Sequence, residues 1–359
     1  MLTATIEKIE KGERLDFEDG INLFKCHDLV LLGRIADNIR KKFHPKKIVT
    51  YIIDRNINYT NICIAKCYFC AFYREVGSPE AYLLSEENLY SKIEETLKLG
   101  GTQILMQGGL HPDLGISFYE NMLRGIKSHY KIHIHAFSPP EIIHIARVSR
   151  LPIEETIKRL KEAGLGSIPG GGAEILEEDV RKKISPAKCT AEEWFSVMRI
   201  AHKIGLKTSA TMMFGHVESL ENRIRHILKV RDLQDETAGF IAFIPWTYQP
   251  ENTRLGGEQS SGSDYLKTLA ISRILLDNFK NIQASWVTQG PKIAQIALSF
   301  GANDMGSTMI EENVVRLAGA CYRMRKEDIE FLIKDSGFLP VQRDTFYNKV
   351  GNDRCVVPT

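Results

Sequence analysis

The stretch Asn58-Tyr-Thr-Asn-Ile-Cys63-Ile-Ala-Lys-Cys67-Tyr-Phe-Cys70 joins a β-rich run to three closely spaced cysteines. The residues up to Ile62 are of the kind that form a strand, and the cysteines follow where that strand would end. Short apolar runs, polar or glycine-containing turns and amphipathic helical stretches then alternate along the chain. The stretch therefore opens a repeating β/α pattern and places reactive side chains at the end of its first strand.

The repeat contains eight strand candidates and predicts an α/β fold, a TIM-type (β/α)8 barrel. A doubly wound open sheet is the rival architecture. The barrel is expected over residues 51–310, with an N-terminal helical cap over 1–50 and a C-terminal helix and tail over 311–359. The strand candidates are 58–62, 103–106, 132–137, 165–168, 208–213, 240–244, 283–287 and 303–306, and helices are expected at 85–99, 153–163, 191–204, 219–233 and 265–278.

Composition narrows the class of protein. The 359 residues include 47 Lys and Arg against 45 Asp and Glu, so the net charge of +2 gives no reason to expect a nucleic-acid or membrane partner. The apolar runs are too short for a membrane span, and the charged first residues lack the apolar core of a secretory signal. We expect a cytoplasmic protein.

The cysteine spacing C-x3-C-x2-C is the strongest chemical signal. Three thiolates can hold a [4Fe–4S] cluster and leave one iron open, whereas a structural zinc site normally has four closed protein ligands. The nearest histidine in the sequence that follows, His111, is about 40 residues away. A zinc or redox-sensor site is the alternative. The remaining cysteines lack ligand spacing and are expected to be free thiols: Cys26, Cys189, Cys321 and Cys355.

This motif, with an aromatic residue before its last cysteine, resembles that of the radical S-adenosylmethionine (SAM) superfamily. Longer stretches are similar to one of its families, the cyclic dehypoxanthinyl futalosine synthases of the futalosine route to menaquinone. The likeness covers residues from about 50 to 330 and rests on 56–74, 101–113, 133–142, 167–176, 211–218 and 243–250.

The resemblance implies two cofactors, a [4Fe–4S] cluster and S-adenosyl-L-methionine. The cluster ligands would be Cys63, Cys67 and Cys70. The implied SAM-binding residues are Tyr68 and Phe69 for the adenine, the segment Gln107, Gly108 and Gly109 for the amino group, Glu174, and Arg181 or Lys188 for the carboxylate.

The implied reaction is a radical ring closure on a small molecule, dehypoxanthine futalosine. A 5′-deoxyadenosyl radical would take the ribose C4′ hydrogen, the carbon radical would add to the benzoate ring, and an electron and a proton would then leave. A base is needed for that proton, and the candidates near strand ends are His135, His216, Glu141 and His111. Partners for the benzoate are expected among Arg74, Gln249 and Gln289.

Several alternatives stay open at this point. Aminofutalosine synthase and deazaflavin-precursor synthases of the same branch would share the cysteine motif and differ in substrate. A non-catalytic metal-binding protein would bind iron or zinc and leave SAM intact. A reducing partner such as flavodoxin or ferredoxin is implied for the enzyme, and no nucleic-acid or membrane partner is expected.

Overall fold

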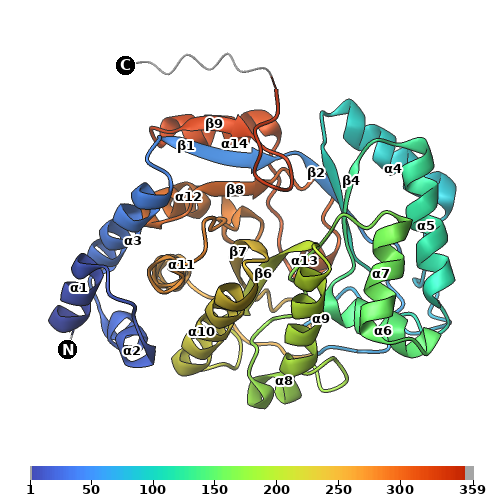
Figure 1. Ribbon diagram of the computed structural model, residues 1–359, viewed down its shortest axis with the longest axis horizontal. Helices are drawn as coiled ribbons and strands as arrows, with labels where there is room; N and C mark the ends of the chain where they lie inside the picture. The colour runs from blue at the N-terminus through green and yellow to red at the C-terminus, as the bar shows by residue number, and fades with distance from the viewer. Residues whose placement is uncertain (1, 352–359) are drawn as a thin grey trace.

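The computed structural model describes residues 2–351 and consists of a curled parallel sheet surrounded by helices (Figure 1). β2 to β7 form one six-stranded sheet in sequence order, and β8, β1 and β9 form a second sheet. The strands are β1 (Ile48–Ile52), β2 (Asp54–Ile57), β3 (Gln103–Met106), β4 (His133–Ala136), β5 (Ser167–Ile168), β6 (Lys207–Phe214), β7 (Phe240–Thr247), β8 (Asp304–Ser307) and β9 (Leu339–Gln342).

The two sheets join into a barrel-like wall. β1 runs into β2 across Ile53. On the other side, Ile282 and Gln283 form parallel bridges to Phe243 of β7 and Asp304 of β8. Eight parallel segments therefore surround a central space, which confirms the predicted barrel-type α/β fold.

Helices cover the outside of this wall. All five predicted helices are present, and Ser85 and Thr190 cap the helices that follow them as expected. The helices are α1 (Leu2–Lys11), α2 (Phe17–Lys25), α3 (Leu29–Phe43), α4 (Glu86–Lys98), α5 (Ile116–His129), α6 (Pro139–Ser149), α7 (Ile153–Ala163), α8 (Glu178–Ile184), α9 (Ala191–Lys203), α10 (Leu220–Thr237), α11 (Gly262–Leu275), α12 (Trp286–Ala297), α13 (Val314–Leu317) and α14 (Lys326–Asp335), with a 3₁₀ turn at Leu298–Phe300.

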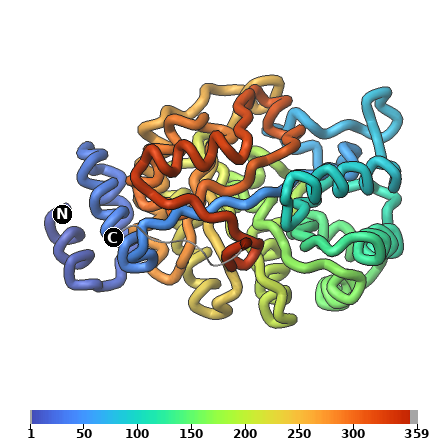
Figure 2. The backbone as a smooth tube through the Cα atoms, turned by 90° about the horizontal axis from the view of Figure 1, so that it is seen from above, coloured from blue at the N-terminus to red at the C-terminus, as the bar shows by residue number. Residues whose placement is uncertain are grey.

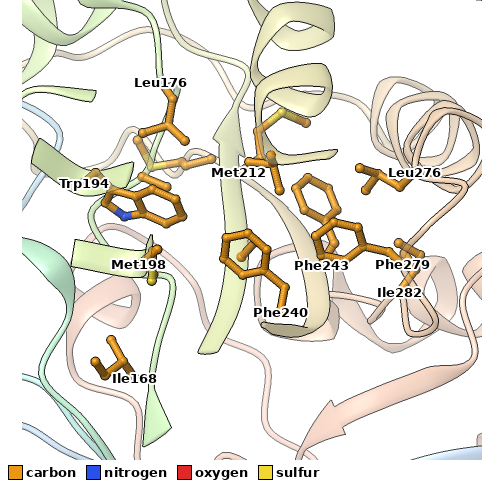
Figure 3. Packing of buried hydrophobic residues seen from close by; sticks show 14 of the residues in the cluster. Ile168, Leu176, Trp194, Met198, Met212, Phe240, Phe243, Leu276, Phe279 and Ile282 are labelled. Carbon is orange, nitrogen blue, oxygen red and sulfur yellow. The ribbon is translucent and has the colours of Figure 1, made fainter. Parts of the chain in front are cut away.

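The hydrophobic core lies between the outer face of the sheet and the helices. Figure 3 shows Met212 of β6 and the two phenylalanines of β7, Phe240 and Phe243, among side chains from neighbouring elements. Trp194 of α9 stacks on Phe240 with ring centroids 6.2 Å apart. Burial of these large side chains on the outer face fixes which residues of each strand point inward.

The N-terminal helices pack on the barrel. Gly20 of α2 lies so close to Ile224 of α10 that a Cβ at this position would come within 2.9 Å of the isoleucine side chain. In Figure 1, α1 to α3 stand at one side of the molecule beside α10 and α11.

Three details of the predicted element order are wrong. The first strand is not 58–62: β1 begins at Ile48, inside the expected helical cap, and β2 ends at Ile57. The candidate at 283–287 is reduced to the bridge at Gln283, because α12 begins at Trp286. The C-terminal extension contains more than a helix, since β9 pairs in parallel with β1. Figure 2 shows this late segment lying along β1.

Candidate active site

A cavity of about 410 Å³ occupies the centre of the barrel and opens at the carboxyl ends of the strands. Its upper wall includes Cys63, Cys67 and Cys70, and its lower wall includes Arg343 and Thr345, which follow β9. The cavity thus brings the cysteine loop, the strand ends and the C-terminal segment to one place. Such a site is where a barrel of this type carries its chemistry.

The cysteine loop is held by backbone hydrogen bonds to four separate segments. Cys63 N–H donates to the Arg74 carbonyl at 3.1 Å, and Tyr68 N–H donates to the Ile184 carbonyl at 2.8 Å. The other two bonds join Ile64 N–H to the Leu110 carbonyl and Leu255 N–H to the Tyr68 carbonyl. A loop anchored in this way presents its thiols in a fixed arrangement without further structure of its own.

The donor set of the loop fits a cubane cluster. Burial raises the pKa of Cys67 to about 12, and the neighbouring Cys70 and Cys63 thiols act in the same direction while Lys188 opposes them. Over residues 2–351, no three His, Cys, Asp or Glu side chains converge closely enough to hold a single metal ion. A cluster makes no such demand, because its cysteine thiolates bind different irons.

Lys188 is the cation beside the thiols. Its Nζ donates to Glu174 Oε1 at 2.9 Å and lies 5.3 Å from the centre of the Phe69 ring. Burial opposes its charge, but Glu174 and Cys67 outweigh that effect and raise its pKa. Glu174 Oε2 is buried and accepts no hydrogen bond from the described residues. An unsatisfied carboxylate oxygen facing a cavity is a position for a ligand donor.

Arg181 lies behind this pair. Its guanidinium donates to the carbonyls of Gly172, Ala173 and Cys189, and its Nη1 is 3.8 Å from Glu174 Oε2. Lys188 lines the cavity, whereas Arg181 is not among its lining residues. The sequence offered both cations equally as partners of the SAM carboxylate, whereas in the structure only Lys188 faces the cavity.

The Gln107–Gly109 segment packs against the cysteine loop without space for side chains. A Cβ on Gly109 would lie 2.1 Å from the Ile62 carbonyl oxygen, and one on Gly108 would lie 2.5 Å from the Tyr59 ring. Glu141 holds this turn by accepting from Gly108 N–H at 2.9 Å and from Tyr59 Oη at 2.7 Å. The glycines are thus required for close backbone approach.

Glu141 lines the cavity but its oxygens are already used. Besides Tyr59 and Gly108, it accepts from the backbone N–H of Ser138 at 2.8 Å and from the Ser138 hydroxyl at 2.5 Å. Burial raises its pKa, and these hydrogen bonds oppose the rise. Four donors on one carboxylate indicate a residue that positions the β3 and β4 strand ends.

His135 is the predicted base candidate that faces the centre of the cavity. Its Nδ1 lies 2.6 Å from the Ser167 hydroxyl, and its Nε2 has no partner among the described residues. Burial lowers its pKa to about 3, with the charges of His133 and Arg343 acting in the same direction. The imidazole is therefore neutral and can accept a proton at Nε2.

The other predicted site residues lie outside the cavity lining. His111 is half-exposed, and His216 bonds to Met213 and Glu218 within its own loop. Tyr68 packs under the Arg254 guanidinium at 4.1 Å. Three substrate-site candidates are held elsewhere: Arg74 by Glu80 and the carbonyls of its own turn, and Gln249 and Gln289 by Thr247.

Sequence reasoning missed the polar interior of the barrel. On β2 and β6, polar side chains that face inward recur at every second position, and a search for apolar runs does not detect this pattern. Asn56 Oδ1 is buried and has no described partner. The missed lining residues include Asp54, Asn56, Asn58, Gln103, Ser209, Thr211, Gln283, Glu312, Arg343 and Thr345.

The fold and the three-thiol cavity together define a radical SAM enzyme, and comparisons with known proteins agree. Residues 57–230 match the family model described as Radical SAM superfamily, and residues 237–354 match the CofH/MqnC C-terminal region. Among solved structures, the FeFe-hydrogenase maturase HydG from Carboxydothermus hydrogenoformans shares the fold, with a TM-score of 0.75 and 18% identity over 96% of this chain and 80% of that one.

Sequence relatives narrow the family. The cyclic dehypoxanthine futalosine synthase of Halalkalibacterium halodurans is 48% identical over 96% of this chain and 94% of its own. The 5-amino-6-(D-ribitylamino)uracil--L-tyrosine 4-hydroxyphenyl transferase of Archaeoglobus fulgidus is 46% identical over 88% of this chain and 92% of its own. The chain belongs to the radical SAM superfamily, in the family that contains the cyclic dehypoxanthine futalosine synthases.

The cofactors follow from this membership. Radical SAM enzymes use a [4Fe–4S] cluster and S-adenosyl-L-methionine, and those are the cofactors of this chain. The cavity takes a small-molecule substrate. No helix between residues 2 and 351 combines the length and apolarity needed to span a membrane.

Proposed function

We propose that this enzyme is a radical SAM cyclase that converts dehypoxanthine futalosine to cyclic dehypoxanthinyl futalosine in menaquinone biosynthesis. The observation that carries the proposal is a cavity in which three thiols stand above a polar barrel interior. The likeness to the Halalkalibacterium synthase over nearly the whole of both chains supports the choice of substrate.

The residues proposed to hold the cofactors are those that meet at the top of the cavity. Cys63, Cys67 and Cys70 would bind the cluster, which together with SAM supplies a 5′-deoxyadenosyl radical. Phe69 would lie against the adenine, and the Gln107–Gly109 segment would approach the SAM amino group. Lys188 is better placed than Arg181 to meet the SAM carboxylate, since only Lys188 lines the cavity. Glu174 Oε2 offers an acceptor for the amino group.

The cavity suits a substrate in which a ribose is joined to a benzoate. Asn56 and Asn58 provide amides for ribose hydroxyls, and the Asn56 acceptor is still unsatisfied. Trp246 and Trp286 line the same space and provide apolar surface for an aromatic ring. Because the interior is enclosed by the barrel, it also keeps a carbon radical away from solvent.

Within the reaction, His135 would accept the proton that leaves after ring closure. It is the histidine that lines the cavity, it is neutral, and its Nε2 is unpaired within the described part of the chain. The accompanying electron passes to a one-electron oxidant of the iron–sulfur class. Flavodoxin or ferredoxin would supply the reducing electron, and the cytoplasm is the expected compartment, in keeping with the free thiols described in this structure.

The test is substrate conversion by the anaerobically reconstituted, dithionite-reduced enzyme, followed by mass spectrometry. We expect 5′-deoxyadenosine together with a product two hydrogens lighter than dehypoxanthine futalosine. The substrates of aminofutalosine synthase and of the 4-hydroxyphenyl transferase are run in parallel. Turnover of one of those and none of dehypoxanthine futalosine would assign the chain to a sister activity. A fully loaded enzyme that leaves SAM intact would contradict the enzyme assignment.

A further inference from the structure

Two histidines and one serine form a continuous chain of hydrogen bonds that begins at the cavity wall and leads downward from it. His135 Nδ1 is 2.6 Å from Ser167 Oγ, and the same oxygen is 2.7 Å from His133 Nε2. His133 and His135 lie two residues apart on β4, so both face the same side, and Ser167 on β5 is paired with His135 in the sheet register. A single hydroxyl therefore bridges an imidazole in the cavity and an imidazole one layer lower.

The two ends of this chain lie in different surroundings. His135 is buried and lines the cavity, whereas His133 is only partly buried and begins its strand at the floor of the barrel. The ring of the exposed Phe346 packs against the His133 ring, with centroids 5.1 Å apart. No described residue bonds to His133 Nδ1. The chain thus leads from the reaction space to the solvent side of the floor.

We propose that His133, Ser167 and His135 form a proton relay that carries the proton lost when the ring-closed adduct is oxidised out through the floor of the barrel. The inference rests on the proposed cyclase function. His135 Nε2 takes the proton from the adduct and His135 Nδ1–H passes to Ser167 Oγ. The serine hydroxyl proton passes to His133 Nε2, and His133 Nδ1–H passes to water. Each group gives one proton and receives one, so charge does not accumulate in the cavity.

The surroundings of the relay favour this transfer over a stable buried cation. Arg343 faces His135 from below, and Lys127 faces His133, so positive charge disfavours an imidazolium at either position, while Asp344 favours one at His133. Both imidazoles have lowered pKa values because of burial, about 3 for His135 and about 4 for His133. A proton taken up at His135 therefore moves toward the less buried histidine.

The deciding variants are Ser167→Ala and His133→Gln in the reconstituted enzyme. The alanine variant removes the bridge. The glutamine variant keeps an amide that can bond to Ser167 but cannot pass a proton on. In both we expect 5′-deoxyadenosine formation within twofold of the wild type, and at least a tenfold fall in cyclised product per deoxyadenosine. A substrate-derived radical should also accumulate in freeze-quenched electron paramagnetic resonance spectra.

Thr208→Val is the matched control. Thr208 Oγ1 makes a 2.8 Å bond to His202 Nε2, so this variant breaks a hydroxyl–imidazole bond of the same kind outside the cavity lining. It should keep the wild-type ratio of product to deoxyadenosine, and iron content and circular dichroism establish that all three variants are folded and loaded. An unchanged ratio in Ser167→Ala and His133→Gln overturns the relay. A wild-type enzyme that forms no cyclised product overturns the proposed function, and the relay with it.

Discussion

The ion pair at the barrel floor gives a stability prediction that can be worked from its geometry. Arg343 Nε and Nη2 donate to the two oxygens of Asp304 at 2.5 and 2.9 Å, and both residues are buried. Asp304 also accepts from Gly306 N–H at 2.8 Å. Replacing Arg343 by Met keeps the apolar volume but leaves a buried carboxylate without its cation.

The expected cost is about 3–5 kcal/mol in the free energy of unfolding, the range for removing one partner of a buried pair. The double variant Asp304→Asn with Arg343→Met should regain at least half of this, because no charge is then left unpaired. As a matched control, Arg199→Met breaks a 2.7 Å pair with Glu236 on the surface and should cost less than about 1 kcal/mol. Urea unfolding of the four proteins gives the comparison. A loss below 1 kcal/mol for Arg343→Met, or a double variant as unstable as the single, would refute the reasoning.

Three other predictions concern the upper cavity. Lys188→Met should weaken SAM binding on the order of tenfold, because a charge-assisted contact is lost. Lys182→Met on the exposed side of α8 is the control. If calorimetry gives Lys188→Met the same SAM affinity as this control, the assignment of Lys188 is wrong. In cluster-free protein at pH 8, the pKa of about 12 leaves roughly 10⁻⁴ of Cys67 as thiolate. Alkylation followed by mass spectrometry should therefore label the exposed Cys321 well before Cys67. The reverse order would contradict the raised pKa of Cys67. Glu141→Gln should lower the free energy of unfolding by about 2–3 kcal/mol, because the NH₂ group of the new glutamine must face a hydrogen-bond donor. A urea midpoint equal to that of the wild type would argue against the positioning role of Glu141.

The sequence predicted the helical layer and most strands because their signals are local. Apolar periodicity and capping residues such as Thr190 are visible in any short window. β2 was missed because its inward face carries Asp54 and Asn56, so a fully buried strand has the composition of a loop. β9 was missed because its partner β1 lies at the other end of the barrel sequence, and no local pattern reports such pairing.

The lining of the cavity was predictable where several of its residues share one short motif. The three cysteines, Phe69 and the Gln107–Gly109 turn all line the cavity. For single residues near a strand end, the sequence could not show which ones face the cavity. In the structure His135 faces the cavity, whereas His216 bonds within its own loop. Lys188 faces the cavity and Arg181 does not. This difference depends on the path of the backbone and could not be predicted from the sequence. Cys355, expected to be a free thiol, lies outside the described residues.

The pairing of Ile48 with Leu339 has a consequence for how the protein is made. A ribosome releases β1 early and β9 almost last, so the nascent chain holds its cysteine motif and most of its barrel before the floor can close. Arg343 and Thr345 enter the cavity only at that final stage. A product truncated just after α14 would therefore retain every expected cluster ligand while giving water access from below, and its iron should be lost to oxygen faster than that of the full-length enzyme.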